Sequence, residues 1–220
     1  FLNFAGVLMT PLVLSFGEPS PLGIVQAIFG IGMLIGSLGM SAWGGAKRRV
    51  LGVIGSITLG GLGLALTGVY PSGFVVGAGL FILLFCVPFA SGMSSAVFQS
   101  KVALEAQGRV SAVRSMISQS MMPLAFLIAG PLADRVFEPW MRQGGTLART
   151  FVGALVGVGD GRGVGLMFVI SGLALVLASG FALANPRIRR IEQELPDMIP
   201  DETEEDGAQL SAAEAIAPAS

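Results

Sequence analysis

The chain has 220 residues, of which 53% are hydrophobic and 12% charged, about half the roughly 25% charged share of a soluble globular domain. With no histidine and one cysteine, it has no side chains for an internal disulfide, a catalytic histidine or a His/Cys zinc site, which excludes most hydrolases and many metalloenzymes. The formal net charge of −1 hides an uneven distribution, because residues 1–186 carry 10 basic and 5 acidic side chains and residues 187–220 carry 3 and 9.

Long uncharged segments predict membrane-spanning helices. A helix needs about 20 mostly apolar residues to cross the hydrocarbon core of a bilayer. The longest uncharged segment, residues 50–100, has room for two crossings, and Tyr70-Pro71-Ser72-Gly73 near its middle combines a helix stop, a turn and an interfacial tyrosine. We therefore predict six hydrophobic helices, at residues 1–16, 22–44, 50–70, 74–99, 115–137 and 164–185.

The predicted fold is an all-α membrane protein. Six transmembrane helices form one domain, residues 1–190, and the acidic residues 191–220 form a disordered cytoplasmic tail that cannot bury enough apolar surface to fold alone. A soluble protein with buried helices is disfavoured by the mean hydropathy of +0.77. A closed β-barrel is disfavoured because the sequence lacks alternating strands of about ten residues.

Basic residues in the connections predict the orientation, because Lys and Arg are retained on the cytoplasmic side. One group of connections carries nine: Lys47, Arg48, Arg49, Lys101, Arg109, Arg114, Arg187, Arg189 and Arg190. The other group carries four: Arg135, Arg142, Arg149 and Arg162. This bias predicts a multi-pass protein of the cell membrane with both termini in the cytoplasm.

The start of the chain is unusual for a membrane protein. The first predicted helix begins at Phe1 without an initiator methionine, a basic flank or a signal-peptide cleavage pattern. We therefore expect the chain to be the C-terminal part of a longer protein. The alternative is a complete small protein whose methionine was removed.

Polar side chains within the apolar helices are candidates for a substrate cavity, because each needs a partner or a wet cavity inside the membrane. Asn3, Gln26 and Gln119 are such residues, and the aromatic Phe89 completes the candidate substrate-lining set. Interhelical hydrogen bonds for the amides and ordinary packing for the ring are the alternatives. No Asp or Glu lies at mid-membrane depth in the predicted helices, so this part of the protein lacks a proton-relay carboxylate.

Three short motifs lie at helix ends. Gly44-Gly45-Ala46-Lys47-Arg48-Arg49 is a basic turn, and Gln107-Gly108-Arg109-Val110-Ser111-Ala112 precedes the fifth predicted helix. Both can hold a cytoplasmic gate, or simply anchor helix ends to anionic headgroups. At the outer end of the fifth helix, Gly130-Pro131 precedes Asp134-Arg135, an adjacent pair of opposite charges that can cap the helix or latch an outer gate.

Over about residues 1–190, these motifs and their spacing resemble the C-terminal half of a major facilitator superfamily (MFS) transporter of the drug and macrolide efflux type. The basic turn is similar to the degenerate second copy of the family's Gly-rich loop motif, although residues 44–49 lack the Asp that latches that loop. The resemblance implies twelve helices in two six-helix halves with the substrate site between them. It therefore implies a missing N-terminal six-helix half.

The resemblance implies efflux of a small amphipathic substrate by alternating access, coupled to inward proton flow. The expected partners are the lipid bilayer, the substrate and the other half. No cofactor, metal site, nucleic-acid partner or enzymatic activity is expected. The alternatives are a truncated inactive half-transporter, a half-sized transporter that works as a homodimer, and a non-transporting scaffold or accessory subunit.

Overall fold

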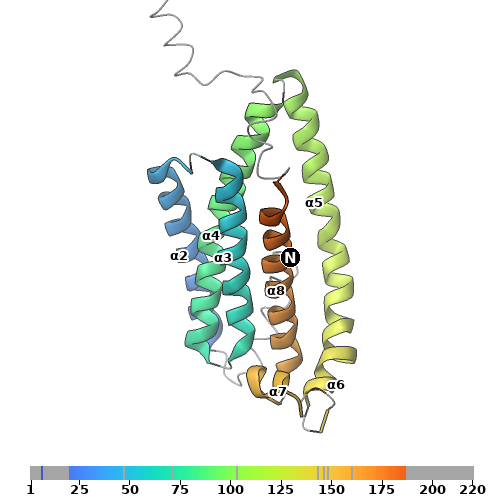
Figure 1. Cartoon of the computed structure of the whole chain (residues 1–220). Coiled ribbons are helices and arrows are strands. Elements are labelled where there is room, and N and C mark those ends of the chain that lie inside the picture. Colours follow the sequence, from blue (N-terminus) through green and yellow to red (C-terminus); the bar gives the residue numbers. More distant parts are fainter. Residues whose placement is uncertain are drawn as a thin grey trace, which may run out of the picture.

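The computed structural model describes Gly6 and residues 20–186, apart from positions 47, 71, 103, 143, 146, 148 and 160. Within these residues the chain is helical and has no strand (Figure 1). The long helices are α2 (Ser20–Trp43), α3 (Arg49–Val69), α4 (Gly73–Lys101), α5 (Leu104–Leu132) and α8 (Arg162–Ala184). The short ones are the π-helical turn η1 (Ala133–Phe137), α6 (Glu138–Met141) and α7 (Phe151–Val156).

Five of the predicted helices are present, and all five are long and apolar enough to cross a membrane. Four of them begin and end within two residues of their predicted bounds. The fifth differs, since it begins at Leu104 rather than at residue 115 and continues through η1 and α6 to Met141. The predicted helix at 1–16, apart from Gly6, and the predicted tail at 191–220 lie outside the described residues.

The long helices alternate in direction, so their connections gather at two ends of the bundle (Figure 1). The α2–α3 turn, the α4–α5 turn and the last turn of α8 lie at one end, which we call the basic end because Arg48, Arg49 and Lys101 lie there. The α3–α4 turn and residues 133–161 lie at the other, which we call the loop end. The described connections of the two charge-defined groups thus lie at opposite ends, and which end faces the cytoplasm stays a prediction.

Glycines of α2 form the surface on which α4 packs. A methyl group on Gly36 would lie 2.5 Å from the carbonyl oxygen of Phe85, so the two backbones are in close contact. Phe81, Phe85 and Phe89 follow one another along this side of α4, with successive ring centroids 6.3 and 5.1 Å apart. The small residues and the aromatic series therefore both serve packing between these two parallel helices. The glycines concerned are Gly32, Gly36 and Gly39.

Helix α3 packs against both α4 and α8 and runs antiparallel to each (Figure 1). A methyl group on Gly172 would lie 2.5 Å from the carbonyl oxygen of Gly61, so α3 and α8 also meet backbone to backbone. Nearer the basic end, the hydroxyls of Thr58 and Ser179 are 2.8 Å apart and form a hydrogen bond between the same helices. The close glycine pairs are Gly61 with Gly172, Gly68 with Gly165 and, towards α4, Gly63 with Gly79.

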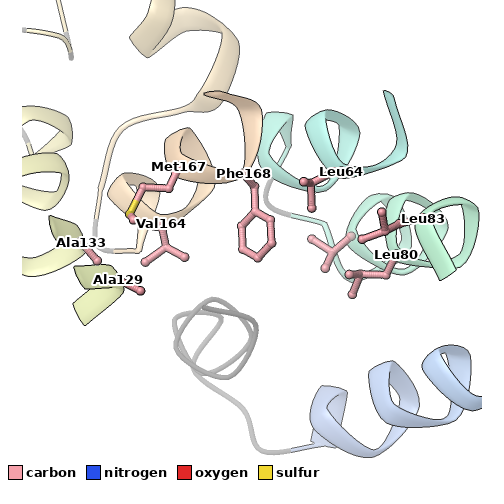
Figure 2. Packing of buried hydrophobic residues seen from close by; sticks show 9 residues of the cluster. Leu64, Leu80, Leu83, Ala129, Ala133, Val164, Met167 and Phe168 are labelled. Carbon is pink, nitrogen blue, oxygen red and sulfur yellow. The ribbon is translucent and has the colours of Figure 1, made fainter. Parts of the chain in front are cut away.

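The largest buried cluster lies towards the loop end. Figure 2 shows Phe168 of α8 beside Leu64 of α3, while Val164 and Met167 point towards the start of η1. This cluster joins α3, α4 and α8 to the C-terminal turn of α5 and the start of η1. A second buried cluster, of Met141, Val156, Leu166 and Val169, holds α6 and α7 against α8.

Helix α5 is otherwise exposed along most of its length. Met116 is 73% exposed and Leu127 72%, whereas Ala129 near its end is fully buried. Leu38 on α2 is 68% exposed. Such apolar surface is compatible with a bilayer or a further helical partner, and it would be a liability in water.

Candidate functional site

At the loop end, the carboxylate of Glu138 receives the first backbone N–H groups of α8. The N–H of Gly161 donates to its Oε1 at 2.6 Å, and the N–H of Gly163 donates to its Oε2 at 3.1 Å. The first N–H groups of a helix have no partner within the helix, and the helix dipole favours a negative charge there. Glu138 therefore caps α8 from a separate helix, α6.

Arg162 lies beneath this cap and is only 6% exposed. Its guanidinium donates a hydrogen bond of 2.9 Å to the carbonyl oxygen of Val156, the last residue of α7. The negative charge of Glu138 also attracts it. A buried arginine needs such partners because an unpaired charge is costly, so this side chain ties α7 to the start of α8.

Glycines allow this close approach. Gly161 has a φ of +78°, a left-handed conformation that residues with a Cβ rarely adopt. A methyl group on Gly163 would lie 2.5 Å from the backbone nitrogen of Glu138. Gly157, Gly161 and Gly163 thus let the chain turn into α8 and pass directly under α6.

The structure gives Asp134 and Arg135 no helix end to cap, and their other predicted role, as a latch of an outer gate, stays a prediction. The helix does not end after Gly130 and Pro131, because it continues through a π-helical turn, so no free helix end is available for these side chains. Asp134 and Arg135 are exposed, and their side chains make no hydrogen bond with described residues. Glu138 has the capping role instead. The sequence features that could have indicated this cap are a single acidic residue and, later in the chain, a Gly-rich segment that contains an arginine.

At the basic end, Gln107 closes the turn between α4 and α5. Its Nε2 donates to the carbonyl oxygens of Gln99 at 3.0 Å and Val102 at 3.1 Å. These carbonyls belong to the last turn and C-cap of α4, where backbone acceptors lack intrahelical partners. Within the predicted Gln107-Gly108-Arg109 motif, the glutamine therefore has a structural role.

Arg114 forms a second link across this turn. Its Nη2 donates to the hydroxyl of Ser94 at 2.9 Å, and its guanidinium carbon lies 4.3 Å from the centroid of the Phe98 ring. A guanidinium over an aromatic face is attracted by the ring quadrupole. A polar hollow of about 110 Å³ lies beside these contacts, between α4 and α5.

The other predicted gate residues that the structure describes lie at the same end of the bundle. Gly44 and Gly45 have φ of +69° and +92° and make the α2–α3 turn. Arg48, Gly108 and Arg109 are exposed, and neither arginine side chain bonds to a described residue. Arg49 is half-buried, and Lys47 lies outside the described residues. A gate built from these residues stays a prediction.

The predicted substrate-lining residues are not gathered in one place. Gln26 and Gln119 are exposed, Phe89 is half-buried against Gly39, and Asn3 lies outside the described residues. Ile28 lies beside Gly77, so Gln26 and Phe89 differ in height by about 14 residues, or roughly 20 Å at 1.5 Å per residue. Their role in binding stays a prediction.

A second hollow, of about 150 Å³, lies among α3, α4 and α8. It is lined almost entirely by apolar side chains, and Ser56 and Cys86 are its polar members. Of the predicted substrate-lining residues that the structure describes, Gln26, Phe89 and Gln119, none is among its lining. Within the described residues, no group of His, Cys, Asp and Glu could hold a metal ion.

These helices define a multi-pass α-helical membrane protein. The chain is 33% identical over 139 residues to macrolide efflux protein A of Streptococcus pyogenes, a match that covers 60% of this chain and 33% of the relative. It is 34% identical over 115 residues to macrolide efflux protein A of Enterococcus faecalis, which covers 49% of this chain and 34% of the relative. The predicted resemblance to drug and macrolide efflux proteins is thereby confirmed.

The chain spans about one third of the length of the curated relatives it matches. No protein-family model and no solved structure matches it.

Proposed function

We propose that the chain forms one half of an MFS-type carrier that exports amphipathic, largely apolar molecules by alternating access. The similarity to two macrolide efflux proteins is the observation that carries this proposal. The relatives are transport proteins, and the helices of this chain suit a bilayer. Both observations favour a transporter over an enzyme.

The chemistry of the helices supports a lipophilic substrate. Residues 50–100, 115–133 and 163–186 contain no charged side chain, so this half offers no fixed charge at membrane depth to bind an ionic ligand. Gln26, Phe89 and Gln119, together with Asn3, are the proposed contacts to the substrate. They would face a second six-helix half across the cavity rather than one another. They therefore need not lie at the same height along the bundle.

The proposed partner is an N-terminal six-helix half. The long exposed apolar surfaces of α2 and α5 support it, because such helices need lipid or another helix to cover them. Proton coupling would use carboxylates of that other half, since the uncharged helices here supply none.

The proposed orientation places the basic end in the cytoplasm of a cell-membrane protein. Arg48, Arg49 and Lys101 lie at this end, and basic connections are retained on the cytoplasmic side. In this orientation the Glu138 cap lies at the outer end of the bundle.

Growth in the presence of drug tests the proposal. Drug-sensitive cells would express the chain alone, or joined to six helices encoded upstream of it, and growth inhibition by a macrolide would be measured. We expect the joined protein to raise the inhibitory concentration at least several-fold and the chain alone to leave it unchanged. Resistance equal to that of empty-vector cells, with normal membrane insertion of the joined protein, would favour an inactive half or a scaffold.

A further inference from the structure

The guanidinium of Arg114 is held in place but has free donors. One nitrogen bonds to Ser94, and the plane of the group lies over Phe98. Arginine has five N–H donors in a rigid fork, and the Arg114 side chain forms only this one hydrogen bond with the described residues. The remaining donors are thus oriented in advance at an exposed position.

The hollow beside Arg114 has the size and lining for a small anion. Its volume of about 110 Å³ is well above the roughly 10–15 Å³ that one water needs. Ser95 and Ser111 add hydroxyl donors to its wall, and none of its lining residues is acidic. Glu105, the nearest acid on α5, is exposed; it lies two residues from the lining residue Gln107 and nine residues, or about 13 Å along the helix axis, from Arg114.

The hollow also lies in a layer of basic side chains at the edge of an apolar helical span. Arg114 is the last charged residue before the uncharged run 115–133. It bonds to Ser94, whose neighbour Met93 contacts Gly52, three residues after Arg49. Arg49, Lys101 and Arg114 therefore lie within about 10 Å of one another along the bundle axis. A basic layer at the edge of an apolar span attracts anionic headgroups.

We propose that this hollow binds the phosphate group of an anionic membrane lipid. Arg114 donates paired N–H groups to the phosphate oxygens, an arrangement that the planar fork favours, and the hydroxyls of Ser95 and Ser111 complete the site. The acyl chains then lie along the exposed apolar side of α5. The lipid would join α4 to α5, which share few other described contacts.

Lipid binding to purified protein tests the proposal. Delipidated protein in mild detergent would be titrated with phosphatidylglycerol, with diacylglycerol, which lacks phosphate, and with soluble glycerol phosphate, and bound molecules would be counted by native mass spectrometry. We expect phosphatidylglycerol to bind and diacylglycerol to bind at least tenfold more weakly. Arg114→Gln should weaken phosphatidylglycerol binding about tenfold or more, whereas Arg109→Gln, the same charge change five residues away, should change it less than threefold.

A second variant covers the possibility that Arg114→Gln folds poorly. Ser111→Leu leaves Arg114 intact but fills the hollow, and the same loss of lipid is expected. Arg114-dependent binding of glycerol phosphate without lipid binding would support the anion site and assign it to a soluble phosphate. Phosphatidylglycerol binding that is unchanged in both Arg114→Gln and Ser111→Leu would overturn the proposal.

Discussion

At the residue scale, the best-defined polar contact of the described chain is the Glu138 cap on α8. It links residues 23 and 25 positions apart, from α6 to the start of α8. Sequence inspection favoured Asp134 and Arg135 instead, because adjacent opposite charges after Gly-Pro are typical of a helix end. No comparable sequence signal marks the π-helical turn through which the helix continues beyond Asp134 and Arg135. The contact between Glu138 and α8 could not be predicted either, because it forms only when the long loop folds back.

Replacing Glu138 tests this cap. Glu138→Ala leaves two N–H groups at the start of α8 without their acceptor, so we expect a loss of about 1–3 kcal/mol of unfolding free energy. In mild detergent this would lower the thermal midpoint by several degrees, as followed by circular dichroism. Asp134→Ala removes an exposed carboxylate on the same helical stretch and should have little effect. Equal midpoints for the two variants would show that the cap does not stabilise the protein.

At the element scale, glycine pairs set the spacing between helices. Uncharged runs predicted where α2, α3, α4 and α8 lie, because a bilayer demands such runs whatever the tertiary packing. The 32 glycines of the chain favour close helix packing in general, because small residues let helix backbones approach. The sequence could not predict which glycine contacts which neighbouring helix. Gly55 and Gly68 both lie in α3, but Gly55 has open space around it.

That difference gives a matched pair of substitutions. A methyl group on Gly68 would collide with the carbonyl oxygen of Gly165 and lie 2.8 Å from Cγ2 of Val169. We expect Gly68→Ala to cost about 1–3 kcal/mol through overpacking. Gly55→Ala should be neutral or stabilise by about 0.5–1 kcal/mol, because alanine is the better helix former. Thermal unfolding in detergent measures both, and a similar shift for the two variants would contradict the observed α3–α8 contact.

At the scale of the whole molecule, charge and helix direction agree. The described connections, grouped by their basic residues, lie at opposite ends of the bundle, as expected when successive long helices run in opposite directions (Figure 1). The arrangement of a substrate cavity could not be predicted to the same extent, because a cavity between two halves depends on residues of both.

Cysteine labelling in intact cells tests the orientation. In a Cys86→Ala background, Arg48→Cys at the basic end and Arg149→Cys at the loop end place single thiols at exposed positions. A membrane-impermeant maleimide added outside should label Arg149→Cys and should label Arg48→Cys only after the membrane is opened. Labelling of both from outside would contradict the alternating crossings, and the reverse pattern would invert the orientation.

Direct efflux measures the central claim. Cells that express the chain joined to six upstream helices would be loaded with a radiolabelled macrolide under de-energised conditions, and its loss would be followed after energy is restored. The proposed carrier predicts loss several-fold faster than in cells with the empty vector, and a return to the control rate when a protonophore is added. Loss at the control rate from cells in which the joined protein is inserted in the membrane would contradict export by this protein.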